Sequence, residues 1–331
     1  MRHGRIVAHF GSPRTTLAGL ALLAVVVLAG SSSGGMVWPL TAVLALLSLN
    51  LCAALVVHPA FRRQLPLLTA HLALLALVVL AAVGRLCALD GRFELTQGVP
   101  FDGRLIDQSR GPLHQERLQR LSFRHDGFEI DYAAGRKRGA TRNSVTWVDA
   151  DGAARSDVIG DHRPLVLEGH RIYTSPNKGF APVMRWEPRQ GEPVVGAVHL
   201  PSYPMHELRQ SREWTLPDGR AVWVMLQFDE VLIDPQAAAA FRLPGEHRLV
   251  VRVGEVRAEL AAGDRLDLDG GTLVYDGLRT WMGYRVSYDP TLAWLLAASL
   301  LAALSLALHY ALKFFGQAAT APRSLTGVID G

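Results

Sequence analysis

Four long apolar runs, each nearly free of charge, dominate this sequence. They cover Leu17–Gly30, Met36–Val57, Leu67–Val83 and Leu292–Leu312. A helix needs roughly 17–25 apolar residues to cross the hydrocarbon core of a bilayer. Only 19% of the 331 residues are charged, which is below the roughly 25% of a typical soluble domain. We therefore expect a membrane α-helical protein with four spans and a large extracytoplasmic domain between the third and the fourth.

The polar block between the third and fourth runs has the pattern of strands. Short segments alternate between apolar and polar residues and end at turn residues. Gly254-Glu255 and Asp269-Gly270-Gly271 each separate two such segments, which predicts two tight hairpins. Further strands are expected at Val194–Leu200, Ala221–Phe228 and Met282–Tyr288, and one helical turn at Gln236–Phe241. The block therefore predicts a β-rich domain, either a sandwich or an open barrel.

Basic residues in the loops predict the orientation of the chain. They lie before the first run, between the second and third, and after the fourth: Arg2, Arg5, Arg14, Arg62, Arg63, Lys313 and Arg323. The loop Ser31–Gly35 carries no charge. The positive-inside rule then places both termini in the cytoplasm and the polar block outside it. We expect three spans in residues 1–84, the outer domain in residues 85–289, and the last span with a short tail in residues 290–331.

The first run has a second interpretation. A basic start, an apolar centre and the small-residue end V-L-A-G-S-S-S also fit a cleaved signal peptide. Cleavage would leave the orientation of the other spans unchanged.

One ionisable side chain lies inside the third run. His71 is close to the cytoplasmic end of that run, in the inner half of the membrane. An ionisable residue in a span is costly and is by default a candidate functional residue. The alternatives are a cofactor ligand and a residue that bonds a neighbouring helix, as many polar residues in spans do. Asn50, in the second run, fits the second role better, and His58 is expected at the interface.

Several activities are excluded by missing motifs. Cys52 and Cys87 are the two cysteines, and neither belongs to a C-x-x-C or C-x-x-C-H motif, so the chain is neither a thioredoxin-like reductant nor a c-type cytochrome. No hydrolase, P-loop or dinucleotide motif occurs. The net charge of +4 follows from the loops and is not accompanied by a nucleic-acid-binding pattern.

The ordered set of features resembles the ResB family, the smaller membrane subunit of the System II cytochrome c assembly machinery. The resemblance rests on L-S-L-N-L at Leu47–Leu51, on T-A-H-L-A-L-L around His71, on P-L-V-L-E-G-H-R-I-Y-T-S at Pro164–Ser175, and on M-G-Y-R-V-S-Y-D-P at Met282–Pro290. It covers the whole chain in order. The chain departs from the family in its S-S-S-G-G segment after the first run and in its shorter length.

The resemblance implies a function in cytochrome c maturation. It implies a multi-pass protein of the bacterial inner membrane with its large domain in the periplasm. The partners would be a ResC-like, Trp-rich membrane protein and apocytochrome c. Haem b would be the cofactor, bound transiently and shared with the partner, and His71 would be an axial ligand. The chain would not be an enzyme alone, but a subunit of a haem lyase (holocytochrome c synthase) complex.

The remaining histidines give weaker signals. His309, on the fourth run, is a candidate second ligand, although an interfacial polar role is preferred. The histidines of the polar block show no metal-ligand spacing and are expected to be solvated or structural: His114, His125, His162, His170, His199, His206 and His247. The alternative function is a structural membrane anchor, whose outer domain docks a partner or apocytochrome without binding haem. A transporter subunit is disfavoured because four spans offer few polar residues to line a path.

Overall fold

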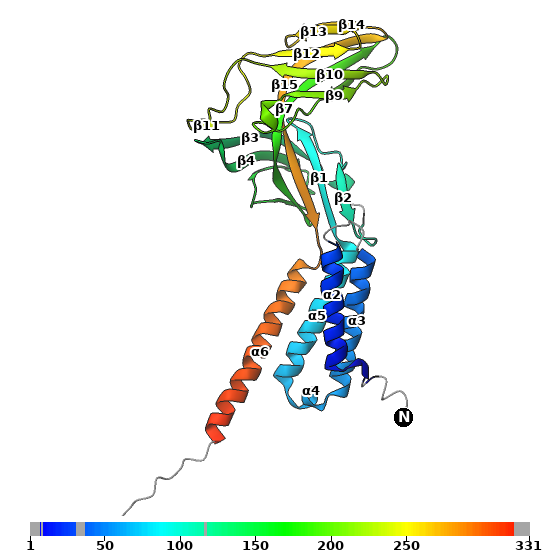
Figure 1. Cartoon of the computed structure of the whole chain (residues 1–331), viewed down its shortest axis with the longest axis vertical. Coiled ribbons are helices and arrows are strands. Elements are labelled where there is room, and N and C mark those ends of the chain that lie inside the picture. Colours follow the sequence, from blue (N-terminus) through cyan, green and yellow to red (C-terminus); the bar gives the residue numbers. More distant parts are fainter. Residues whose placement is uncertain (1–6, 8, 31–36, 116–117, 321–331) are drawn as a thin grey trace, which may run out of the picture. The chain divides into compact units, whose positions relative to one another are not determined.

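The apolar runs form the long helices of the molecule. The computed structural model describes residues 7, 9–30, 37–115 and 118–320. The four candidate spans are α2 (Pro13–Gly30), α3 (Val37–Val57), α5 (Leu65–Cys87) and the first 24 residues of α6 (Leu292–Thr320). The short helix α4 (Pro59–Arg63) joins α3 to α5 (Figure 1). The prediction of four spans is confirmed, and the chain is a multi-pass membrane protein. The loop Ser31–Gly35 and the basic residues Arg2, Arg5 and Arg323 lie outside the described residues.

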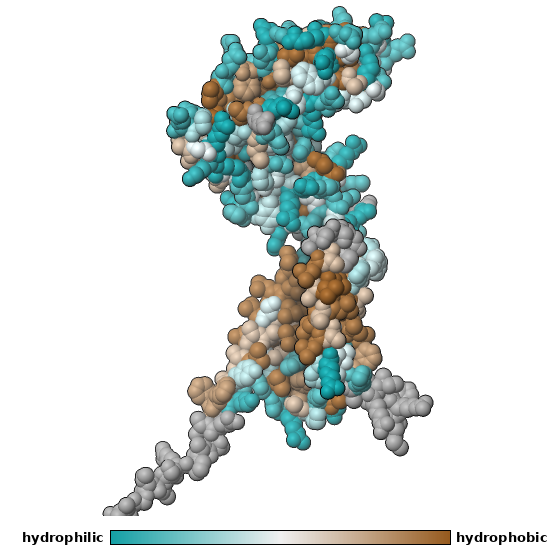
Figure 2. Space-filling view, viewed as in Figure 1, coloured by the Kyte–Doolittle hydropathy of each residue, from teal (hydrophilic) through white to brown (hydrophobic). Residues whose placement is uncertain are grey.

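Small residues bring the helices together. A side chain at Gly19 of α2 would meet Leu47 of α3, and one at Gly84 of α5 would meet Thr291 before α6. Ala70 and Ala73 are buried on α5. Small residues let helix backbones approach closely where lipid provides no hydrophobic drive for association. Many of the large apolar side chains instead face outward and cover the surface of the helices, which is brown in Figure 2.

Asn50 joins two of the helices, as the sequence predicts. Its Oδ1 accepts a hydrogen bond of 2.8 Å from Thr16 Oγ1 on α2. Its Nδ2 donates to the backbone oxygen of Phe10, and the side chain is buried. The polar groups of Asn50 are therefore used in packing α3 against α2.

The chain divides into two compact units. The helical unit comprises residues 1–89, 109–115 and 289–331, and the β unit comprises residues 90–108 and 116–288. Residues 109–115 belong to the helical unit because they bond to the end of α5. Gly111 N donates to Ala88 O, and Leu113 N donates to Leu86 O. This segment therefore satisfies carbonyl groups that a helix end leaves without partners.

The β unit contains three antiparallel sheets. The largest has seven strands, in the order β2-β1-β15-β7-β6, with β14 added to β15 and β8 added to β7. Its strands are β1 (Leu89–Thr96), β2 (Asp107–Arg110), β6 (Leu165–Leu167), β7 (His170–Pro188), β8 (Val194–Ala197), β14 (Arg265–Leu268) and β15 (Gly271–Tyr288). The second sheet consists of β9 (Ser211–Thr215), β10 (Ala221–Gln227), β12 (Arg248–Val253) and β13 (Val256–Leu260). The third consists of β3 (Phe123–Ala133), β4 (Lys137–Val148), β5 (Ala154–Ile159) and β11 (Ala239–Ala240). Two 3-10 turns, η1 (Leu118–Arg120) and η2 (His206–Leu208), complete the elements.

Both predicted hairpins are confirmed. β12 and β13 pair across Gly254-Glu255, and β14 pairs with the start of β15 across Asp269-Gly270. Gly254 and Gly270 have positive φ angles, which glycine adopts without steric cost. The prediction of a sandwich or open barrel did not anticipate three sheets. The helical turn predicted at Gln236–Phe241 is wrong, because Ala239 and Ala240 pair with β3 as the short strand β11.

Aromatic side chains from different strands fill the core of the β unit. Phe93 of β1 stacks on Tyr284 of β15 with ring centroids 5.1 Å apart, and Phe123 of β3 lies edge-on to the same tyrosine at 5.8 Å. Each of these side chains is at most 2% exposed. Burial of large rings contributes much of the stability of such a core.

Candidate functional site

The imidazole of His71 has a defined orientation on α5. Its Nδ1 lies 2.8 Å from the backbone oxygen of Leu67, one turn earlier in the helix. A carbonyl oxygen can only accept a hydrogen bond, so Nδ1 carries a proton, and in the neutral imidazole the lone pair is then on Nε2. Among the described residues Nε2 forms no hydrogen bond. The side chain can therefore act as an Nε2 ligand for a metal.

Phe61 of α4 forms one wall of this site. Its ring centroid lies 4.5 Å from that of His71, with an angle of 57° between the planes. The ring of His58 is edge-on to that of Phe61, with centroids 6.3 Å apart, and its Nε2 is 3.3 Å from the backbone oxygen of Gly11. The site therefore places an aromatic surface beside an imidazole whose Nε2 forms no hydrogen bond among the described residues. Sequence reasoning missed Phe61, because its contact with His71 depends on how the short helix α4 turns back toward α5.

Two arginines follow Phe61 on α4. Arg62 donates to the backbone oxygen of Val56 at 3.2 Å. Within the described part of the chain, neither Arg62 nor Arg63 forms an ion pair. Their charges are therefore available to anionic groups at this end of α5.

His309 lies on α6, and among the described residues no hydrogen bond or ring contact joins it to His71. It is partly exposed, and its ring lies beside that of the neighbouring Tyr310, with centroids 5.3 Å apart. The structure therefore shows no direct bond between the two predicted ligands.

The two outer segments that carry the resemblance lie side by side in the β unit. Ile172, Tyr173 and Thr174 of β7 pair with Val286, Arg285 and Tyr284 of β15. These positions are more than 100 residues apart in the sequence, so their pairing could not be read from either segment alone. They form the middle of the largest sheet.

The outer histidines do not gather into a site. Three make side-chain hydrogen bonds of 2.7–2.8 Å: His125 to Asn143, His199 to Glu94 and Thr96, and His247 to Tyr275. Burial lowers the pKa of His125 to about 4 and also lowers the pKa of His247. His170 is buried, His114 bonds to Cys87 O, and His162 and His206 are exposed. Across the described ranges no group of three metal-ligating side chains occurs.

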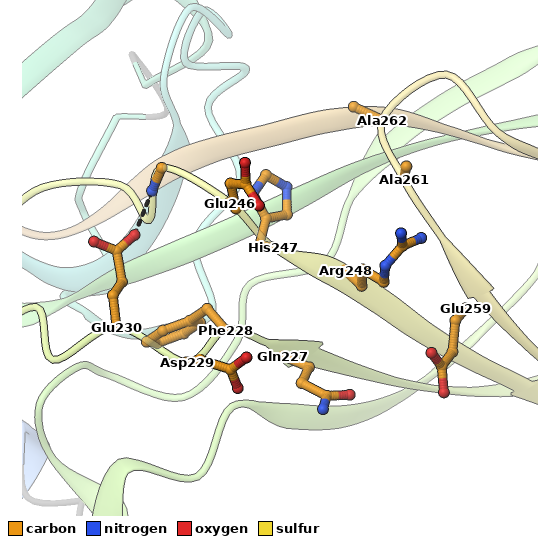
Figure 3. Close-up of a pocket in the computed structure, with 11 residues that line it drawn as sticks. Gln227, Phe228, Asp229, Glu230, Glu246, His247, Arg248, Glu259, Ala261 and Ala262 are labelled. Atoms are coloured by element: carbon orange, nitrogen blue, oxygen red, sulfur yellow. Dashed lines mark hydrogen bonds between the residues drawn. The ribbon is translucent and has the colours of Figure 1, made fainter.

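A pocket of about 840 Å³ opens in the β unit beside β10, β12 and β13 (Figure 3). Its charged side chains are mixed, with Arg248 near Glu246 and Glu259. Glu230, at one side, is held by Arg242 and by the backbone N–H of Gly245. The open, mixed lining does not point to one ligand chemistry.

No protein-family model matches the chain, and the search of curated proteins found no match. The candidate site therefore rests on its own geometry and on the resemblance read from the sequence.

Proposed function

We propose that the chain is a ResB-like subunit of a cytochrome c assembly complex, which handles haem b together with a ResC-like, Trp-rich partner and serves apocytochrome c. It would lie in the bacterial inner membrane, with both termini in the cytoplasm and the β unit in the periplasm. The orientation of the His71 imidazole carries this proposal. The activity belongs to the complex, so the chain is not proposed to be an enzyme alone.

The chemistry of His71 fits an axial haem ligand. Haem iron is commonly held by a neutral imidazole. A histidine that ligates a metal usually donates its other ring N–H to a carbonyl or carboxylate, which fixes the tautomer and the ring orientation. The hydrogen bond to Leu67 O has this arrangement. Bound haem would supply the iron, and Nε2 of His71 would hold it.

The surroundings of His71 fit the rest of such a ligand. The ring of Phe61 offers an apolar face next to the imidazole. Arg62 and Arg63 offer positive charge for the carboxylates of haem. The resemblance takes the second ligand from the partner, and among the described residues no second imidazole is in ring contact with His71.

Co-purification tests this proposal. The chain is expressed with and without a Trp-rich partner, and haem is measured per complex by absorption spectroscopy. We expect haem with the complex and its loss in His71→Ala, while His309→Ala, the matched change on α6, keeps most of it. Equal haem in wild type and His71→Ala would contradict the proposal.

A structural membrane anchor is the alternative function. The contact between His71 and Phe61 also packs α4 against α5, as Asn50 packs α3 against α2. In that case His71→Ala weakens helix packing without changing haem content. The same co-purification experiment separates the two functions.

A further inference from the structure

Lys178 is buried in the β unit, where the pairing of β7 with β15 is interrupted. The register changes between Lys178↔Met282 and Thr174↔Tyr284, so residues 175–177 bulge out of β7. The backbone of Lys178 is fixed by two hydrogen bonds of 3.0 Å, one to Ser202 Oγ and one from Tyr203 N. The side chain is only 2% exposed. Lysine is almost never buried to this extent unless it is paired.

The ammonium group of Lys178 has few partners for its charge. It has three N–H donors, and the structure gives it one hydrogen bond, of 3.4 Å, to Pro176 O. It lies 5.4 Å from the centroid of the Tyr132 ring, a cation–π contact. No carboxylate forms an ion pair with it in the described part of the chain.

Two further polar atoms close to Lys178 are buried without a hydrogen-bond partner. They are the hydroxyl of Tyr132, whose ring lies beside the ammonium of Lys178, and Nε of Arg138, the residue that pairs with Tyr132 between β3 and β4. A terminal nitrogen of Arg138 donates to Asp161 at 2.8 Å, and Thr174 donates to the same carboxylate oxygen at 3.0 Å. The one carboxylate of the cluster is therefore already bonded, and hydrogen-bond donors are in excess.

The charges of the cluster also favour a bound anion. Burial, and then the charge of Arg138, lower the pKa of Lys178 to about 8, while Asp161 opposes the change. Lys178 is therefore still mostly cationic at neutral pH. With Arg138 and Asp161 it gives the cluster a net positive charge. Buried donors without acceptors are rare in native proteins and commonly mark a bound ion or water.

We propose that Lys178, Tyr132 and Arg138 form a binding site for one small inorganic anion of the chloride type. The anion accepts hydrogen bonds from the ammonium, the phenol and the guanidinium, and it balances the net charge. A monatomic ion fits best because Lys178 and Tyr132 are almost fully buried, which leaves little room for a larger anion. The site is independent of the proposed haem function, since all of its residues lie in the β unit.

Thermal unfolding of the full-length protein in detergent tests the site. Potassium chloride replaces potassium gluconate at constant ionic strength, and unfolding of the β unit is followed by tryptophan fluorescence. In wild type, raising the chloride concentration tenfold, starting from its dissociation constant, raises the midpoint temperature of unfolding by about 2–4 °C. Lys178→Met abolishes this dependence, and Tyr132→Phe weakens it. Lys137→Met, at an exposed lysine of the neighbouring β4, leaves it unchanged.

A second measurement uses the wild type alone, so it tests the site even where Lys178→Met fails to fold. Crystals of the wild type grown in potassium bromide should show anomalous scattering within hydrogen-bond distance of Lys178 Nζ. An ordered water without anomalous signal at that position would overturn the proposal. Equal midpoints in chloride and gluconate for wild type, or an unchanged chloride response in Lys178→Met, would also overturn it.

Discussion

The ring of Phe61 packs against the imidazole of His71, with centroids 4.5 Å apart. Phe61 belongs to the short helix α4 and His71 to α5, so the contact fixes one helix against the other at this end of the span. The imidazole is then held from two directions, by this ring and by the oxygen of Leu67. A ligand side chain that is held in this way loses little freedom when it binds a metal.

Phe61 should therefore influence haem binding without being a ligand. We expect Phe61→Leu to lower the haem affinity of the partnered complex by a factor of about ten, the lower end of the effect of losing a group that orients a metal ligand. The matched control is Phe315→Leu, at an exposed position on α6. Equal haem loss in both variants would count against a specific role for Phe61.

Asn50 should stabilise the helical unit by its bond to Thr16. Hydrogen bonds between transmembrane helices contribute about 0.6 kcal/mol on average and at most about 1.7. We expect Asn50→Leu and Thr16→Val each to destabilise by about 0.5–2 kcal/mol in detergent-induced unfolding, and the double variant to lose less than the sum. Ser48→Ala is the control, because Ser48 bonds within its own helix, to Leu44 O. Strict additivity of the first two changes would show that the bond does not couple α2 to α3.

Protease cleavage should show the orientation of the chain in the membrane. The turn of the β3–β4 hairpin carries exposed Arg136 and Lys137. In intact spheroplasts we expect trypsin to cleave this turn and to leave Arg62 and Arg63 intact. Both regions should be cut once the membrane is permeabilised. Cleavage after Arg62 or Arg63 in intact spheroplasts would show that the chain has the opposite orientation.

His125 should make the stability of the β unit depend on pH. Burial lowers the folded-state pKa of His125 to about 4, below the ordinary histidine pKa of 6.5 that applies when the chain is unfolded. The unfolded chain then binds the proton more readily, so stability falls as the pH decreases from about 6.5 through about 4. The full loss is about 3 kcal/mol. His125→Gln keeps an acceptor for Asn143 but cannot titrate, so it should flatten this part of the profile. Identical profiles for wild type and His125→Gln in urea unfolding would show that the residue does not contribute.

The parts of the fold that could be predicted from the sequence are those determined by residues close together in the chain. Apolar runs and the turns at Gly254 and Gly270 determine the spans and hairpins locally. The central pair of strands, β7 and β15, joins residues about 100 positions apart, and no local pattern specifies that register. Gln236–Phe241 has the composition of a helical turn, but pairing with β3 overrides that preference.

The candidate site was partly predictable for the same reason. His71 stands out as the one ionisable residue in an apolar run, whereas Phe61 becomes part of the site only through the turn between α3 and α5. Lys178 lies in the polar sequence P-N-K-G, which is typical of an exposed turn. Its burial follows from a bulge between distant strands, and burial of this kind leaves no signal in the local sequence.

Chemical rescue of a His71 variant tests the haem proposal most directly. His71→Ala removes the imidazole and leaves a space beside Phe61, which free imidazole is small enough to enter. We predict that the variant, expressed with its partner, inserts normally but assembles little cytochrome c, and that added imidazole partly restores both haem content and assembly. His309→Ala should lose little and gain nothing from imidazole. Normal haem content and normal cytochrome c in the His71→Ala strain would contradict the account and favour a structural anchor.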